Sequence, residues 1–190
     1  RRPPSRTVSP PRARTRAVGG AGRDFCRAGP GRRGPRDRSF EAHMAMAKKH
    51  GIAMQIHGRD AHDAVLETLT RVGAPDTTVF HCFSGDDAMG RVCADAGYYM
   101  SFSGNVIFKN AQNLRDALAA TPLDLILVET DAPSLTPVPL RGRPKAPYLV
   151  PITLRFMVAV LALAVDELCA HISATPRRVD GSFARTLALL

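Results

Sequence analysis

The chain has 190 residues, 45% of them hydrophobic, so it is long enough to bury the core of one ordinary domain. Its net charge of +9 is uneven: residues 1–38 contain twelve Arg and two acidic residues, whereas the remainder has 14 basic and 15 acidic residues. The basic character therefore belongs to the N-terminal segment and does not by itself indicate that the globular part binds nucleic acid.

Residues 1–38 are rich in Arg, Pro and Gly and nearly lack large apolar side chains. Such a composition buries too little apolar surface to offset the entropy lost on ordering. We therefore predict a disordered segment over 1–38 and a folded domain over 39–183.

The spacing of the cysteines indicates the cellular compartment that we expect. The four of them, Cys26, Cys82, Cys93 and Cys169, show no CxxC spacing, which argues against structural zinc and favours a reducing compartment. The sequence also contains no apolar run of 18 residues, the length that a membrane span requires. We expect a cytoplasmic location and no contact with a membrane.

From residue 39 onward, apolar runs alternate with helical patterns. Strands are predicted over 52–57, 77–83, 98–104 and 123–130, and helices over 39–51, 60–73, 86–97, 110–121, 148–165 and 165–179. Apolar strands that alternate with helices indicate parallel βα units, which close into a (β/α)₈ barrel or form an open doubly wound sheet. In both architectures the functional residues lie at the carboxyl ends of the strands.

Three of these strand ends carry metal-ligating side chains. The first strand ends at His57, the second continues into His81, and the fourth is followed by Asp131. Imidazole and carboxylate groups together suit zinc, manganese and similar divalent ions. Two plainer readings stay open, because a histidine after a strand often hydrogen-bonds within its loop, and an Asp before Ala-Pro often caps a turn.

Several motifs, in order, resemble the TatD family of metal-dependent deoxyribonucleases. They are "IHGRDA", "VFHCFSG", "YYMSFSGNVIFKNA", "LILVETDAPSLTPVPLRG" and "DELCAHIS". The resemblance implies an α/β fold, an incomplete TIM-barrel-like (β/α)₈ barrel of the amidohydrolase type. It also implies hydrolysis of phosphodiester bonds in DNA, with RNA as a further substrate, by one or two divalent ions (Mg²⁺, Mn²⁺ or Zn²⁺).

The resemblance also implies roles for individual residues. His57, His81 and Asp131 are expected to hold metal, with Asp131 also orienting or deprotonating the attacking water. Glu129 is expected in a supporting contact, and Arg141 to face a substrate phosphate through its guanidinium.

The chain departs from the family pattern in three places. The His-x-His pair of the family's first strand is missing, and Gly20 in "AVGGAGRDFCRAG" stands where a bridging Glu is expected. In "RPKAP", Lys145 and Ala146 replace the usual Asn-Glu. We expect the barrel to lack its first strands and the sequence before Ser39 to be a truncated or frame-altered counterpart of the family's N-terminal region.

These departures leave two alternatives to an active deoxyribonuclease open. The first is a non-catalytic barrel remnant that binds nucleic acid through its Arg-rich N-terminal segment, with the steep salt dependence of phosphate contacts. The second is a related metal-dependent barrel hydrolase that acts on another ester or on an amide, because the fold alone does not choose the substrate. Both retain the fold and differ in the chemistry that they assign to the strand ends.

Overall fold

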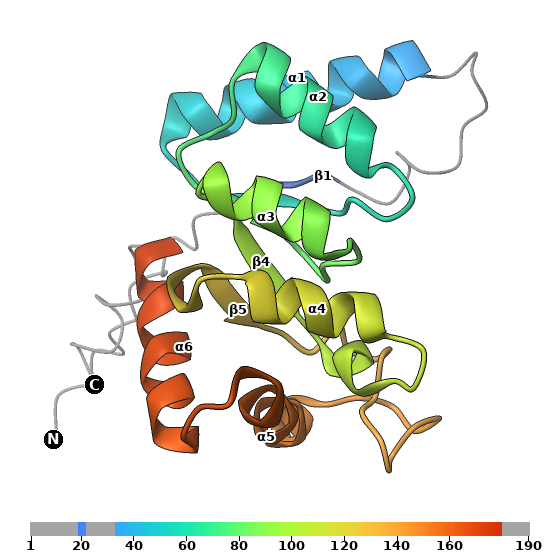
Figure 1. Ribbon diagram of the computed structural model, residues 1–190. Coiled ribbons are helices and arrows are strands. Elements are labelled where there is room, and N and C mark those ends of the chain that lie inside the picture. Colours follow the sequence, from blue (N-terminus) through green and yellow to red (C-terminus); the bar gives the residue numbers. More distant parts are fainter. Residues whose placement is uncertain (1–18, 22–32, 180–190) are drawn as a thin grey trace, which may run out of the picture.

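A computed structural model describes residues 19–21 and 33–179, which form one parallel sheet covered by helices (Figure 1). The five described strands lie in the order β1-β2-β3-β4-β5, and every neighbouring pair is parallel. The elements therefore follow one another across the sheet in the order of the sequence, from α1 at one end to α5 and α6 at the other (Figure 1).

The strands are β1 Gly19–Ala21, β2 Met54–Ile56, β3 Thr78–Phe80, β4 Tyr99–Phe102 and β5 Ile126–Val128. The α-helices are α1 Arg33–His50, α2 His62–Val72, α3 Asp87–Asp95, α4 Gln112–Ala120, α5 Val150–Leu161 and α6 Val165–Val179. Short 3₁₀ turns occur at η2 Gly104–Ile107, η3 Leu123–Leu125 and η4 Pro147–Leu149. This alternation confirms the predicted α/β fold, and within the described residues the barrel is not closed.

The N-terminal boundary requires a correction. The predicted disordered segment included Gly19–Ala21 and Arg33–Arg38, but the first range forms β1 and the second begins α1. β1 pairs with β2 through its backbone, a contact that needs no large side chain, and Arg is a good helix former. The rest of that segment, residues 1–18 and 22–32, lies outside the described part of the chain, as do residues 180–183 of the predicted domain.

Local sequence explains how the helices begin and end. In α2, Val65 and Leu69 are buried one turn apart, so the apolar stripe faces the sheet, and Gly73 follows the helix with φ 78°. At the start of α3 the carboxylate of Asp86 accepts a hydrogen bond of 3.0 Å from the backbone N–H of Met89. This is the N-cap arrangement that satisfies a free amide of the first turn.

The core lies between the strands and the helices. Alternate strand residues are almost fully buried in it: Met54, Ile56, Phe80, Met100, Phe102 and Ile126. Leu69, Leu118, Met157 and Leu168 from four helices belong to the same apolar cluster. Removing one of these large side chains would cost about 2–5 kcal/mol through lost burial and a residual cavity. This packing positions the strands, and with them the residues at their carboxyl ends.

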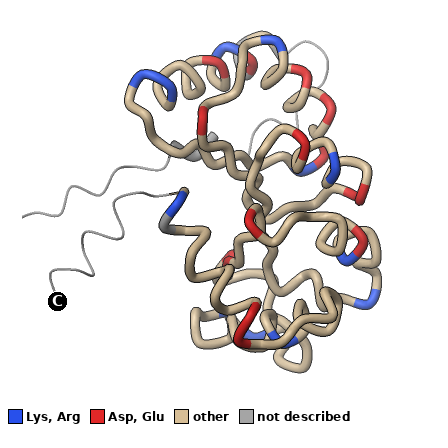
Figure 2. Tube along the Cα trace, turned by 60° about the vertical axis from the view of Figure 1, so that its left-hand side comes forward, with Lys and Arg blue, Asp and Glu red and all other residues tan. Residues whose placement is uncertain are grey.

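Two properties of the surface bear on partners. No single described helix is long and apolar enough to cross a membrane, although Pro147–Leu161 and Val165–Pro176, bent by 113°, meet both criteria together. In the view of Figure 2, Lys and Arg are interspersed with Asp and Glu along the described chain. The described part therefore presents a mixed-charge surface in this view.

Candidate metal centre

Backbone hydrogen bonds carry the sheet one residue beyond β3 and β5 and so fix two side chains of the centre. The N–H of His81 donates to the carbonyl of Ile56 at 2.9 Å, and the N–H of Glu129 donates to that of Phe102 at 3.0 Å. His81 and Glu129 therefore stand at the carboxyl edge of the sheet on backbone as firmly held as the strands. Asp131 follows two residues after Glu129.

The backbone beside these residues is unusual. Cys82 and Asp131 have positive φ values of 44° and 51°, although neither is glycine. Asp adopts this left-handed region more readily than most residues, whereas for Cys it is uncommon. Strained backbone of this kind clusters at functional sites, where the surrounding structure holds it in place. Here it lies at the ends of the two strands that carry His81 and Asp131.

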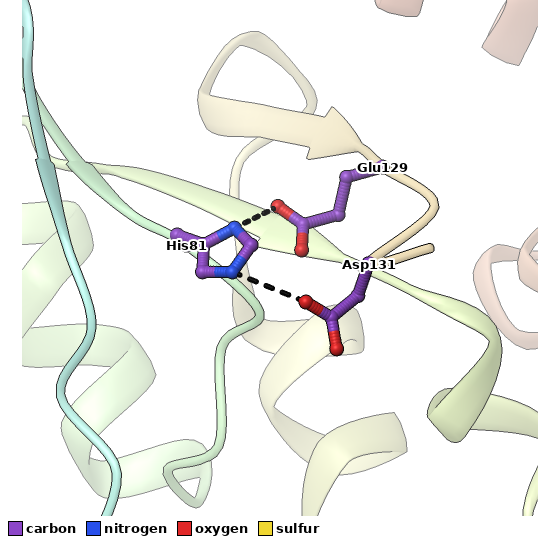
Figure 3. A group of neighbouring side chains, drawn as sticks. All are labelled: His81, Glu129 and Asp131. Atoms are coloured by element: carbon purple, nitrogen blue, oxygen red, sulfur yellow. Dashed lines mark hydrogen bonds and ion pairs between the residues drawn. The ribbon is translucent and has the colours of Figure 1, made fainter. Parts of the chain in front are cut away.

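His81 lies between two carboxylates (Figure 3). Its Nδ1 lies 2.8 Å from Glu129 Oε2, and its Nε2 lies 3.4 Å from Asp131 Oδ1. The three side chains are partly buried, with 25%, 15% and 32% of the His81, Glu129 and Asp131 side chains exposed. One ligand atom of each lies within 4.8 Å of the other two, so this cluster has the composition and spacing to hold a metal ion.

The carboxylates change the acid–base behaviour of His81. The hydrogen bond to Glu129 is the main cause that raises the pKa of His81 above its usual value, and burial opposes this effect. The charges of Glu129 and Asp131 act in the same direction as the hydrogen bond. A cation between these groups would replace the proton that His81 otherwise tends to keep.

His57 lies beside the cluster. Its ring centroid is 6.0 Å from that of His81, with the two planes 40° apart. Of the predicted ligand set His57, His81 and Asp131, the structure thus brings His81 and Asp131 together with Glu129 and places His57 next to them. The assignment of metal ligation to the three predicted residues stays a prediction.

Cys82, next to His81, is a protonated thiol in the metal-free chain. Burial raises the pKa of its thiol to about 11. Its Sγ lies 3.7 Å from Ser103 Oγ, and that hydroxyl donates to Asn105 Oδ1 at 2.9 Å. Cys82 therefore acts as a small, largely apolar residue under the centre.

Arg141, the predicted phosphate-binding residue, stacks on an aromatic ring. Its guanidinium carbon lies 4.3 Å from the centroid of Phe108, a cation–π contact. The residue is exposed, in the loop between β5 and α5. Stacking restricts the side chain while leaving its N–H groups to bind an anion, but contact with substrate stays a prediction.

Sequence reasoning missed Lys145 as a residue of this site. It is 4% exposed, and burial lowers the pKa of its ammonium, while the carboxylates of Glu129 and Asp131 act in the opposite direction. The available signal was the departure from the family pattern in "RPKAP", because a Lys in place of an uncharged residue has to be accommodated by something nearby.

Comparison with known proteins finds relatives of this chain that are described as metal-dependent hydrolases. The family described as TatD related DNase matches residues 11–180. The chain is 43% identical over 143 residues to the uncharacterized metal-dependent hydrolase TatD of Mycobacterium tuberculosis, covering 75% of this chain and 54% of that protein. It is 40% identical over 131 residues to the uncharacterized metal-dependent hydrolase YcfH of Escherichia coli, covering 68% of this chain and 49% of that protein.

Solved structures resemble the fold. The TatD homologue YJJV of Escherichia coli superimposes with a TM-score of 0.73 at 24% identity, covering 77% of this chain and 57% of that chain. A TatD family hydrolase of Entamoeba histolytica gives 0.71 at 13% identity, covering 86% and 62%. The chain spans about half the length of the curated relatives that it matches.

Proposed function

The chain belongs to the TatD family of metal-dependent hydrolases, and from that premise we propose that it hydrolyses phosphodiester bonds of DNA with one or two divalent metal ions. Mg²⁺, Mn²⁺ and Zn²⁺ are the candidate ions, and RNA is a second candidate substrate. The observation that carries the proposal is the position of His81 between Glu129 and Asp131 at the carboxyl edge of the sheet.

The cluster of His81, Glu129 and Asp131 has the donor atoms and the spacing to hold a divalent ion, and His57 lies beside it. His81 Nε2 and a carboxylate oxygen of Asp131 point toward each other, and His57 is the neighbouring imidazole. His81, Asp131 and His57 would hold the ion. When bound, such an ion lowers the pKa of a coordinated water and polarises a phosphoryl oxygen.

Glu129 prepares His81 for this role. By accepting the hydrogen bond from Nδ1–H, it fixes the ring orientation and leaves Nε2 as the nitrogen that faces Asp131. A carboxylate behind a ligating imidazole also raises the basicity of that ligand. We assign Glu129 to positioning His81.

We assign proton transfer to Asp131 and phosphate binding to Arg141. Asp131 would accept a proton from the attacking water, a role that needs an ionised carboxylate within hydrogen-bonding reach of that water. Arg141 would hold a non-bridging phosphate oxygen with its planar fork of N–H groups, restricted by the stack on Phe108. Both residues belong to the segment between β5 and α5.

The test is cleavage of end-labelled single-stranded and duplex DNA by the purified full chain with added Mn²⁺. We expect His81→Ala and Asp131→Ala to lower the rate by about 10²- to 10⁴-fold. His50→Ala, an exposed histidine at the end of α1, is the matched control and should keep the rate. Folding of each variant is checked by circular dichroism.

The same preparation separates the alternatives. Cleavage of RNA but not DNA would reassign the substrate, and turnover of p-nitrophenyl esters or dipeptides without cleavage of either nucleic acid would favour the related barrel hydrolase. DNA binding with no turnover of any substrate would favour the non-catalytic remnant. Each of these results would overturn the proposal of a deoxyribonuclease.

A further inference from the structure

Lys145 is a buried cation whose charged end has no hydrogen-bond partner among the described residues. It is 4% exposed, and its Nζ makes no hydrogen bond with any described residue. Lysine is almost never this buried unless it is paired, because an ammonium loses its hydration on burial. Its position therefore needs an explanation beyond packing.

The fold holds this residue in place at the centre. The N–H of Lys145 donates to the carbonyl of Pro133 at 3.0 Å, which ties its backbone to the segment directly after Asp131. At the other end of the side chain, a Cβ atom added to Gly104 would lie 3.0 Å from Lys145 Nζ. Gly104, which follows β4, thus leaves room for the ammonium at the carboxyl edge of the sheet.

The nearby charges are those of the proposed metal centre. The carboxylates whose charges act on Lys145 are Glu129 and Asp131, which follow β5. Glu129 in turn has one oxygen bound to His81, while its other oxygen, Oε1, is buried and has no hydrogen-bond partner among the described residues. A partnerless ammonium and a partnerless carboxylate oxygen therefore lie in one partly buried cluster.

These observations point to an electrostatic role. A positive charge inside a protein stabilises neighbouring carboxylates and repels a second cation that binds to them, and this effect is far stronger than in water. The backbone of Lys145 is tied to the segment after Asp131, and Gly104 leaves room for its ammonium, so the positive charge lies at the same edge of the sheet as the carboxylates.

We propose that Lys145 is a built-in counter-ion of the Glu129–Asp131 carboxylate pair, whose single positive charge offsets part of the negative charge of that pair without metal and lowers the affinity of the centre for divalent ions. This inference rests on the proposed metal centre. It adds a property of this chain's own residues, a fixed cation that competes with the metal.

The experiment measures binding of Mn²⁺ to the full, chelator-treated chain by isothermal titration calorimetry. Lys145→Met keeps the apolar stem and removes the charge, and Lys145→Asn removes the charge with a smaller polar side chain. We expect both to bind Mn²⁺ about tenfold more tightly than the unchanged chain. Lys145→Arg keeps the charge and should bind as the unchanged chain does.

Lys109→Met is the matched control, since it makes the same change of net charge at an exposed position before α4. It should leave the Mn²⁺ affinity unchanged. Equal affinities for the unchanged chain, Lys145→Met and Lys145→Asn would overturn the counter-ion role while leaving the metal centre intact. Tighter binding by Lys145→Arg would also overturn it, because the effect would then come from packing.

Failure of the metal centre gives a different result. If the unchanged chain and all variants bind no Mn²⁺ at millimolar concentration while circular dichroism shows them folded, both the centre and the counter-ion role are overturned. If Lys145→Met does not fold, Lys145→Asn and Lys145→Arg still supply the comparison of a removed with a retained charge.

Discussion

Two parts of the sheet, the β1–β2 side and the β3–β5 side, differ in the side chains that follow their strands at the carboxyl edge. After β3 and β5 stand His81, Glu129 and Asp131, connected to one another by contacts of 2.8 and 3.4 Å. β1 is the segment Gly-Gly-Ala, which has no ligating side chain, and β2 is followed by His57 alone. The β3–β5 side is therefore a connected cluster, and the β1–β2 side supplies one imidazole.

The contrast shows that a strand of this sheet can be in place without the metal-ligating side chain that the family resemblance expects on it. β1 pairs with β2 in parallel register, Gly20 opposite Gln55, as a strand of this sheet should. Successive residues of a strand point to opposite faces, so Gln55 and His57 share one face, and a side chain at position 20 would belong to that same face. The strand is in place at the position where the resemblance to the family expected a Glu.

The distinction between the two sides would fail if the imidazoles of His57 and His81 contributed equally to Mn²⁺ affinity. We expect His81→Ala to weaken Mn²⁺ binding by more than about a hundredfold, since it removes the residue connected to both carboxylates. His57→Ala should weaken it by about tenfold, because one ligand is lost from an otherwise intact cluster. Calorimetric titration of both variants gives the ratio, and equal losses would mean that the β1–β2 side matters as much as the β3–β5 side.

Replacing Glu129 by Gln tests how much of the cluster depends on a positioning residue. The amide retains the size of the side chain but loses the charge that favours a proton on Nδ1 of His81. We expect Mn²⁺ affinity to fall by about 10- to 100-fold, the usual cost of losing a carboxylate behind a ligating histidine. Glu67→Gln, an exposed residue of α2, makes the same chemical change and should bind as before.

The sequence predicted the β3–β5 side better than the β1–β2 side for physical reasons. Short runs of β-branched and aromatic residues such as Thr78–Phe80 predict buried strands when they alternate with helical patterns, and the polar residue after each run then lies at the sheet edge. Gly19–Ala21 carries no such pattern, because a strand held only by its backbone leaves no trace in hydrophobicity. Composition therefore predicted disorder for those residues.

Lys145 illustrates a second limit of prediction from the sequence. Its burial depends on the hydrogen bond to Pro133 and on the space at Gly104, which are 12 and 41 positions away along the chain. Neither periodicity nor local composition reports on contacts of that kind, and a Lys in a loop is normally solvated. The role of Arg141 was predicted from resemblance, whereas its stack on Phe108 needed the structure.

Gly20→Glu tests the comparison further by adding a carboxylate to the β1–β2 side, which has fewer ligating side chains. Position 20 pairs with Gln55, on the face that His57 shares, so a carboxylate there adds negative charge to the edge of the sheet. We expect Mn²⁺ affinity to rise by about tenfold. Gly20→Gln has the same size without the charge and should not strengthen binding; a gain in that variant would show that the charge is not responsible.

The smallest expected effect concerns the metal-free chain and its dependence on pH. Because the folded chain raises the pKa of His81 above 6.5, mainly through the Glu129 hydrogen bond, the native state keeps this proton to higher pH than the unfolded state does. The pair's contribution to the free energy of unfolding is therefore complete below about pH 6.5 and is lost as pH rises through the raised pKa. Urea unfolding with a chelator present should show Glu129→Gln less stable than the unchanged chain by about 1 kcal/mol at pH 5.5, and by less at pH 8.5. A difference that is the same at both pH values would mean that the charged His81–Glu129 pair does not stabilise the β3–β5 side.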